Sequence, residues 1–261
     1  MTSWLGQYCI NVADLERSVA MYTALGLQCT SRTSIEQADE AIVECPGKGG
    51  KIQLAQQRAN VGPIQMGNAL WKLYLNCNDI ERTYRAALDL GCQLVSAPQR
   101  TERWPVTIAF VTDLDGYLVE FVQRHPWLDG DTDTPSWVGQ YCLNVSDIDS
   151  TIAFYELLGF QCTSRTDIPQ AKEAIIENPD LGGKLQLAQQ LIDPQPITMG
   201  TAMWKLYVNT DECESLHRLA VAAGHRSVVA PQRLARWPVT ISFLADPDGY
   251  QVELVQRHVI Q

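Results

Sequence analysis

Polar side chains occupy alternate positions along strand-like segments of this 261-residue chain. Lys72 and Tyr74 alternate with leucines along residues 71–77, and Glu120 alternates with apolar residues along residues 117–124. Successive side chains of a strand point to opposite faces, so each segment presents one polar and one apolar face. An ammonium group can stabilise an oxyanion and a carboxylate can transfer protons. These faces are therefore candidates for acid–base chemistry on a small molecule.

The same pattern returns 133 positions later. Residues 3–125 align with residues 136–258 without a gap, and about seventy of the 123 aligned positions are identical, which indicates a duplicated domain. The chain is predicted to hold one domain at residues 1–126 and a second at residues 136–261. Residues 127–135, which contain a glycine, a proline and aspartates, are the expected linker.

Each copy reads as two successive β-α-β-β-β units. In the first copy, Asp14 caps a helical pattern that ends at Gly26, and a second helical pattern ends at Gly91. Strand-like runs cover residues 6–12, 27–33, 40–45, 50–57, 71–77, 92–97, 105–111 and 117–124. The expected fold class is α+β.

Composition narrows the class of partner. The formal net charge of −10 and the pI near 4.8 argue against nucleic acid and anionic membranes. The N-terminal segment resembles no signal peptide and no apolar run is long enough to span a bilayer, so a cytoplasmic protein with a small-molecule ligand is expected. The eight cysteines form no C-x-x-C motif and are expected to be buried free thiols, with metal or redox use as the alternative.

The end of each copy carries a recognisable motif. TDLDGYLVEFVQR (residues 112–124) and ADPDGYQVELVQR (residues 245–257) resemble the D-P-D-G-Y-x-x-E-L signature of the vicinal oxygen chelate superfamily, which includes glyoxalase I, bleomycin-resistance proteins, methylmalonyl-CoA epimerase and extradiol dioxygenases. The Q-Y-C-I-N-V openings match the first strand of that family. The resemblance covers nearly the whole chain and implies a tandem duplication in which each domain has two β-α-β-β-β modules and a curled mixed sheet enclosing a cavity.

The resemblance also implies a set of site residues. In that family, four strand positions usually hold a divalent metal. The corresponding residues of the two copies are Gln7, Gln53, Lys72 and Glu120, and Gln140, Gln186, Lys205 and Glu253. A lysine ammonium has no lone pair for a metal, so we expect no metal and no other cofactor, with a Lys–Glu pair across the cavity instead. A neutral lysine or a shifted ligand set would restore a metal site.

Two arrangements of the sites are compatible with the duplication. Family dimers combine the first unit of one domain with the second unit of the other, which would give a first site of Gln7, Gln53, Lys205 and Glu253 and a second site of Gln140, Gln186, Lys72 and Glu120. In the extradiol dioxygenase arrangement each domain closes its own site. The chain is expected to be a monomer with pseudo-twofold domain pairing, or a homodimer.

A second motif, Q-R-x-x-R-W-P-V-T-I, occurs in both copies. Its Arg103 and Trp104, with Arg236 and Trp237, are expected to line the cavity mouth and bind an anionic or planar group; in the alternative, the tryptophan packs beneath its loop. The same alternatives apply to Arg32, Arg165, Trp71 and Trp204. The tyrosines Tyr74 and Tyr207 are further candidate substrate contacts, whereas His125 and His258 are expected on the opposite strand face with no role in the site.

Three functions remain open. The first is a metal-independent lyase, isomerase or epimerase for a small carbonyl or enolisable compound, possibly aromatic, in which Lys72 and Lys205 stabilise an enolate or form a Schiff base and Glu120 and Glu253 act as general bases. The second is a non-catalytic protein that binds a metabolite or antibiotic. The third is a metal-dependent glyoxalase or dioxygenase with altered ligands.

Overall fold

The computed structural model describes residues 2–59, 62–125 and 136–258, so the expected linker at residues 127–135 lies outside the described residues. The first half contains the elements β1 (Ser3–Asn11), α1 (Leu15–Ala24), β2 (Gln28–Ser34), β3 (Ala38–Cys45), β4 (Lys48–Gln57), β5 (Leu70–Cys77), α2 (Ile80–Asp89), β6 (Gln93–Arg100), β7 (Val106–Thr112) and β8 (Leu118–Arg124). The second half repeats them as β9 (Ser136–Asn144), α3 (Ile148–Leu157), β10 (Gln161–Asp167), β11 (Ala171–Glu177), β12 (Lys184–Gln190), β13 (Met203–Thr210), α4 (Cys213–Ala222), β14 (Arg226–Arg233), β15 (Val239–Ala245) and β16 (Gln251–Arg257). The α+β class and the β-α-β-β-β order are confirmed.

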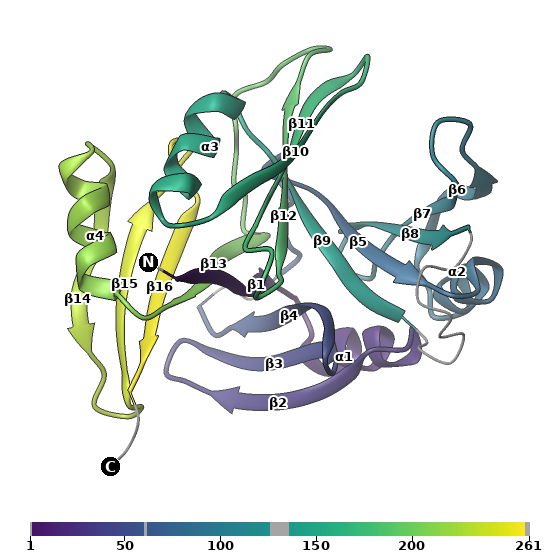
Figure 1. The fold of residues 1–261 in the computed structure, drawn as a ribbon. Helices are drawn as coiled ribbons and strands as arrows, with labels where there is room; N and C mark the ends of the chain where they lie inside the picture. Colours follow the sequence, from purple (N-terminus) through teal and green to yellow (C-terminus); the bar gives the residue numbers. More distant parts are fainter. Residues whose placement is uncertain (1, 60–61, 126–135, 259–261) are drawn as a thin grey trace.

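The two halves exchange strands to build curled mixed sheets (Figure 1). Strand β1 pairs with β4 of its own half and with β13 of the other half, and β13 continues to β16, β15 and β14. The equivalent pairing joins β9 to β12 and to β5, which continues to β8, β7 and β6. Each curled sheet is therefore assembled from the first unit of one half and the second unit of the other.

Each β-α-β-β-β unit contains one short helix, and an aspartate N-cap defines where three of the helices begin. Asp14, Asp79 and Asp147 accept hydrogen bonds from backbone amides in the first turns of α1, α2 and α3. The helices α1 and α4 pack against β2–β4 and β14–β16, respectively. Their apolar sides join one continuous core that spans both halves.

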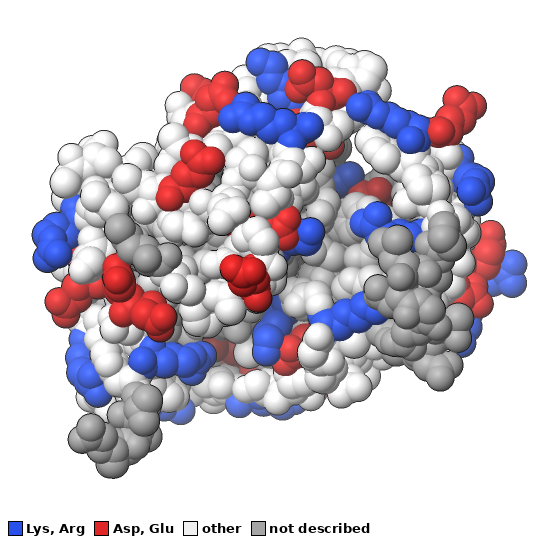
Figure 2. Space-filling model, viewed as in Figure 1, with Lys and Arg blue, Asp and Glu red and all other residues white. Residues whose placement is uncertain are grey.

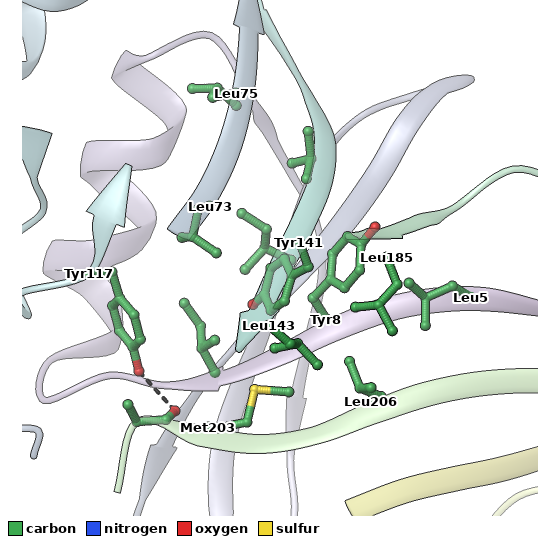
Figure 3. Close-up of a cluster of buried hydrophobic side chains, with 14 of the residues drawn as sticks. Leu5, Tyr8, Leu73, Leu75, Tyr117, Tyr141, Leu143, Leu185, Met203 and Leu206 are labelled. Atoms are coloured by element: carbon green, nitrogen blue, oxygen red, sulfur yellow. Dashed lines mark hydrogen bonds between the residues drawn. The ribbon is translucent and has the colours of Figure 1, made fainter. Parts of the chain in front are cut away.

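The centre of this core holds a pair of equivalent tyrosines. Tyr8 of β1 and Tyr141 of β9 stack with ring centroids 3.8 Å apart and an interplanar angle of 7° (Figure 3). Both rings are essentially inaccessible to solvent, and the Tyr8 hydroxyl donates a hydrogen bond to the Lys184 carbonyl of the other half. The stack joins the two strands from which the neighbouring Gln7 and Gln140 project.

The D-x-D-G-Y motif has a structural role. One carboxylate oxygen of Asp113 accepts hydrogen bonds from the backbone amides of Asp115 and Tyr117, and the other accepts one from the Tyr22 hydroxyl at 2.8 Å. The Tyr117 hydroxyl then lies 2.6 Å from the Asn11 carbonyl oxygen and 2.8 Å from that of Ala202. The motif thus fastens its own turn and ties β1 to the start of β13 in the other half.

The Gly- and Pro-rich loops of the two halves also bind each other. The Asn68 amide donates to the Thr198 carbonyl at 2.9 Å, and the Thr201 amide donates to the Gln65 carbonyl at 2.7 Å. Gly67 sits in this contact with φ of 62°, and a Cβ atom there would lie 2.1 Å from the Thr198 oxygen. We call residues 63–69 and 196–202 the interlocked loops, because neither can accept a larger side chain at its glycine.

The expectation of buried thiols holds for five of the eight cysteines, whereas Cys29, Cys45 and Cys162 are partly exposed. All eight lie in the described part of the chain, and none of them forms a disulfide. Lysine and arginine side chains are interspersed with aspartate and glutamate on the face shown in Figure 2, so no basic surface forms there. Among the described residues, none of the helices combines the length and the apolar character needed to cross a bilayer.

Candidate active site

A cavity of about 960 Å³ opens on the concave side of the sheet that joins β1 to β13. It brings together Gln7 of β1, Gln53 of β4, Lys205 of β13 and Glu253 of β16. Two of these side chains come from each half of the chain. The structure thus has the site shared between domains, and the alternative in which each domain closes its own site does not apply.

Lys205 and Glu253 form a buried ion pair. The Lys205 Nζ atom lies 2.7 Å from Glu253 Oε2, and the two side chains are 11% and 8% exposed. Burial alone would lower the pKa of Lys205, but the charge and hydrogen bond of Glu253, together with the nearby Cys9 and Glu40, outweigh burial, and the pKa is raised. The equivalent Lys72 Nζ and Glu120 Oε2 atoms are 2.6 Å apart, and the pKa of Lys72 is raised by the same balance. Both lysines therefore remain cations, which opposes a Schiff-base role.

An aromatic ring lies against each ammonium group. Lys205 Nζ is 4.2 Å from the centroid of the Trp204 ring and 5.7 Å from that of Phe243. Contacts at these distances stabilise a cation that has left bulk water. Trp204 also lines the cavity, so it serves the site directly.

The glutamines are held by hydrogen bonds to each other. The Gln7 amide nitrogen donates to the Gln53 carbonyl oxygen, which also accepts from the Cys9 thiol at 3.1 Å. In the second site, Gln140 donates to Gln186 at 2.6 Å and Cys142 does so at 2.8 Å. Burial raises the pKa of both thiols, so each remains a neutral donor.

A further carboxylate lies in the cavity that the sequence interpretation did not assign to the site. Glu40 of β3 lines it, and the Gln53 side chain hydrogen-bonds to it. Burial raises the pKa of Glu40, and the negative charge of Glu253 adds to this effect. Glu173 has the equivalent place beside Gln186, and burial raises its pKa too. One signal was present in the sequence: Glu40 is identical between the two copies.

The Arg–Trp motif lies at the cavity mouth, as expected. Arg236 and Trp237 line the cavity, and the guanidinium carbon of Arg236 is 4.6 Å from the centroid of the Trp237 ring. Arg236 Nη1 also donates to the Ser34 carbonyl at 3.0 Å, across the two halves. Arg103 similarly stacks on Trp104 and donates to the Asp167 carbonyl. Each of these arginines therefore binds a backbone carbonyl of the opposite half.

Tyr207 also lines the cavity, next to Arg257, whose Nη2 donates to the Tyr207 hydroxyl at 3.3 Å. Burial raises the pKa of Tyr207 to about 12 and raises that of Tyr74 as well. Both phenols are thus neutral hydrogen-bond donors near neutral pH.

The structure also shows where His258, Arg32 and Arg165 lie relative to the cavity. The expectation that His258 has no place in the site is wrong: it lines the cavity just after β16 ends, with its Nε2 atom 2.8 Å from the Thr240 hydroxyl. Because His258 lies beyond the end of β16, the alternation of side chains along that strand does not predict on which side its ring lies. Arg32 and Arg165 instead form surface ion pairs with Glu16 and Asp149.

The positions equivalent to the cavity lining carry nearly the same residues in the other copy. Of the 25 residues that line the cavity, all but three are identical to the residue 133 positions away. The exceptions are Glu36, Leu234 and Gln251, which correspond to Pro169, Thr101 and Leu118. Identity is thus far higher around the cavity than across the whole repeat.

The four side chains at the family metal positions do not fit a divalent ion. The Lys205 ammonium contacts the Glu253 carboxylate, and the Gln53 oxygen already accepts two hydrogen bonds. A cation without a lone pair at this point repels a metal instead of binding it. Among the described residues, no group of three or more His, Cys, Asp or Glu side chains is arranged to hold an ion.

Comparisons with known proteins agree with the fold. The chain is 28% identical over 175 residues to a lactoylglutathione lyase of Oryza sativa, a match that covers 64% of this chain and 57% of the rice protein. It is 24% identical over 262 residues to a lactoylglutathione lyase of Arabidopsis thaliana, covering 94% of this chain and 89% of that one. The structure of glyoxalase I from Zea mays superposes with a TM-score of 0.85 at 22% identity, over 98% of this chain and 92% of the maize chain.

A more distant structural relative is a putative dioxygenase from Bacillus subtilis, with a TM-score of 0.70 at 12% identity over 98% of this chain and 86% of that chain. The family model described as "Glyoxalase/Bleomycin resistance protein/Dioxygenase superfamily" matches residues 4–121 and 137–254, once in each half. The protein is therefore a tandem member of the glyoxalase, bleomycin-resistance and dioxygenase superfamily.

Proposed function

We propose that the protein is a metal-independent lyase, isomerase or epimerase that acts on a small carbonyl or enolisable compound at two equivalent sites. The observation that carries this proposal is the buried contact of 2.7 Å between Lys205 Nζ and Glu253 Oε2, in a cavity that both halves line. The Lys205 ammonium, held in place by Glu253, is a fixed positive charge at one of the positions where family members bind a metal ion.

The chemistry follows from that charge. A substrate carbonyl oxygen next to Lys205 gains negative charge when a base removes the proton from the adjacent carbon, because the C–H electron pair moves onto the oxygen. The ammonium group stabilises this enolate in a site that excludes most water. Return of the proton to a neighbouring carbon gives an isomer, and return to the opposite face gives an epimer.

Polar and aromatic residues of the wall would orient the substrate. Gln7 and Tyr207 line the same cavity as the ion pair and can hydrogen-bond to a substrate, and Trp237 can contact a flat part of it. Because relatives carry the name lactoylglutathione lyase, a 2-hydroxyacyl thioester such as lactoylglutathione is the first substrate to test.

Proton exchange tests the proposal directly. Chelator-treated protein is incubated in D2O with lactoylglutathione, 2-hydroxyketones and α-oxoaldehydes, and loss of the proton next to the carbonyl is followed by NMR. We expect exchange by the wild type and none by Lys72→Met/Lys205→Met. No exchange with any of these compounds, or exchange that returns only after a divalent metal is added, would overturn the proposal.

A second function is favoured by the aromatic lining of the cavity. Trp204, Trp237 and Phe243 could hold a ring-bearing metabolite or antibiotic without chemistry. Calorimetry with aromatic metabolites would then give two ligands bound per chain, with the ligand recovered unchanged. That result, together with no proton exchange, would replace the enzymatic proposal.

A further inference from the structure

Each site contains two carboxylates in different settings. Glu253 is in contact with the Lys205 ammonium, whereas Glu40 lies on the other wall of the same cavity and hydrogen-bonds to the Gln53 side chain. The Glu253 carboxylate already has an oxygen in contact with that ammonium, whereas no ion pair occupies the Glu40 carboxylate among the described residues. The position of Glu253 suits it to hold the lysine charge in place.

The neighbouring glutamines fix the direction of the hydrogen bond to Glu40. The Gln53 carbonyl oxygen already accepts hydrogen bonds from Gln7 and Cys9, so its amide nitrogen is the atom left to donate to the Glu40 carboxylate. This chain of donors starts on β1 and ends at a carboxylate of β3. It orients the Glu40 carboxylate, and Lys205 acts on this carboxylate from across the cavity.

Comparison of the two copies indicates that both sites require a glutamate at the position of Glu40. Glu40 and Glu173 are identical and have equivalent glutamine partners, Gln53 and Gln186. The residue just before them changes from Asp39 to Lys172, a reversal of charge on the opposite face of the same strand. The charge of the outward-facing residue has therefore changed between the copies, whereas the adjacent glutamate that faces the cavity has not.

We infer that Glu40 and Glu173 are the catalytic bases of the two sites, and that Glu253 and Glu120 position the lysines. This inference rests on the proposed function. It revises the expectation that Glu120 and Glu253 act as bases.

The proposed proton transfer needs only the substrate and side chains of the site. A Glu40 oxygen takes the proton from the carbon next to the substrate carbonyl, the C–H electron pair forms the enolate, and Lys205 stabilises the negative oxygen. The Glu40 carboxylic acid then gives a proton back to the enolate carbon; in D2O the acid first exchanges with solvent, so a deuteron is returned. No oxidant, reductant or further reactant is required.

Paired substitutions separate a base from a structural residue. Glu40→Gln/Glu173→Gln keeps the size and the hydrogen-bonding capacity of both side chains but removes the base, whereas Glu40→Asp/Glu173→Asp keeps a carboxylate on a shorter stem. Proton exchange of lactoylglutathione is measured by NMR, and its affinity is measured by calorimetry. We expect exchange to fall about 100-fold or more in the Gln pair and less in the Asp pair, with affinity changed by only a few-fold in both.

Asp39→Asn is the matched control, since it removes a charge from the neighbouring residue, whose carboxylate pairs with Arg58 outside the cavity. It should exchange at the wild-type rate. Exchange by the Gln pair at or above the rate of the Asp pair would overturn the inference while leaving the proposed function intact. Wild-type protein without exchange would instead overturn the proposed function, and this inference with it.

Discussion

Lys205 and Glu253 lie on the adjacent parallel strands β13 and β16, with Nζ and Oε2 2.7 Å apart and both side chains about nine-tenths buried. The register pairs Tyr207 with Glu253, so the lysine lies two residues along the same face of β13. The geometry of the pair is therefore set by strand pairing and not by a mobile loop.

Removing only the lysine should cost stability. Lys205→Met leaves the Glu253 charge buried without its partner, and we expect the free energy of unfolding to fall by about 3 kcal/mol. Lys205→Met/Glu253→Gln removes both charges and should recover most of that loss, although the first site stays inactive. Urea unfolding followed by circular dichroism measures both variants. A single variant as stable as the wild type would contradict the buried ion pair.

The three differences between the sites should produce unequal affinities. Lys72→Met disables the second site and leaves the first to be measured alone. Glu36 at the wall of the first site should weaken an anionic ligand, so Glu36→Gln in the Lys72→Met background should tighten its binding by about two- to fivefold. Calorimetry with the same ligand at low and moderate salt measures the effect, which should shrink as salt rises. Unchanged affinity at low salt would exclude a role for Glu36.

Stability should depend on pH through Asp246. Burial raises its pKa from 3.8 to about 7, so the folded chain binds a proton that the unfolded chain releases at lower pH. Its contribution to stability is complete below pH 3.8 and is lost as pH rises through about 7. Asp246→Asn keeps an oxygen for the Tyr250 amide and cannot titrate.

Thermal unfolding of the wild type and Asp246→Asn from pH 5 to pH 8 tests this dependence. The melting temperature of the wild type should fall relative to that of the variant across this range. Because other groups titrate equally in both proteins, the difference between them isolates Asp246. Parallel curves would show that Asp246 has an ordinary pKa.

The interlocked loops should not tolerate a methyl group. Gly67→Ala combines a left-handed backbone with a Cβ atom 2.1 Å from the Thr198 oxygen, and we expect a loss of about 3 kcal/mol in unfolding free energy. Gly47 also has a positive φ, but no atom lies within 4 Å of the place its Cβ would take, so Gly47→Ala should cost only about 1 kcal/mol. Equal losses in the two variants would mean that backbone conformation alone decides the cost.

Local patterns predicted the elements well. Asp14 accepts a hydrogen bond from the first turn of α1, and Gly26 follows the helix with a φ of 103°, as the sequence indicated. Alternation also placed Gln7 and Gln53 on the faces that line the cavity, and Lys72 and Glu120 on the faces where they form a buried ion pair, because a period of two depends only on neighbouring residues.

Features that depend on contacts between residues far apart in the sequence could not be predicted from local patterns. The exchange of strands between halves depends on β1 meeting β13 across the whole chain, and alternation is the same in either arrangement. The partner of Arg32 is Glu16 on a neighbouring element, which the spacing of residues does not reveal. Glu40 was missed because it is not one of the four family metal positions.

The exchange of strands has a consequence for how the gene can evolve. Duplication usually creates redundancy, in which one copy is free to diverge while the other preserves the activity. Here each site takes Gln7 and Gln53 or their equivalents from one half and a lysine and a glutamate from the other, so neither copy is a spare. A damaging change in either half disables a site that the undamaged half cannot rebuild alone, and selection therefore acts on both copies together.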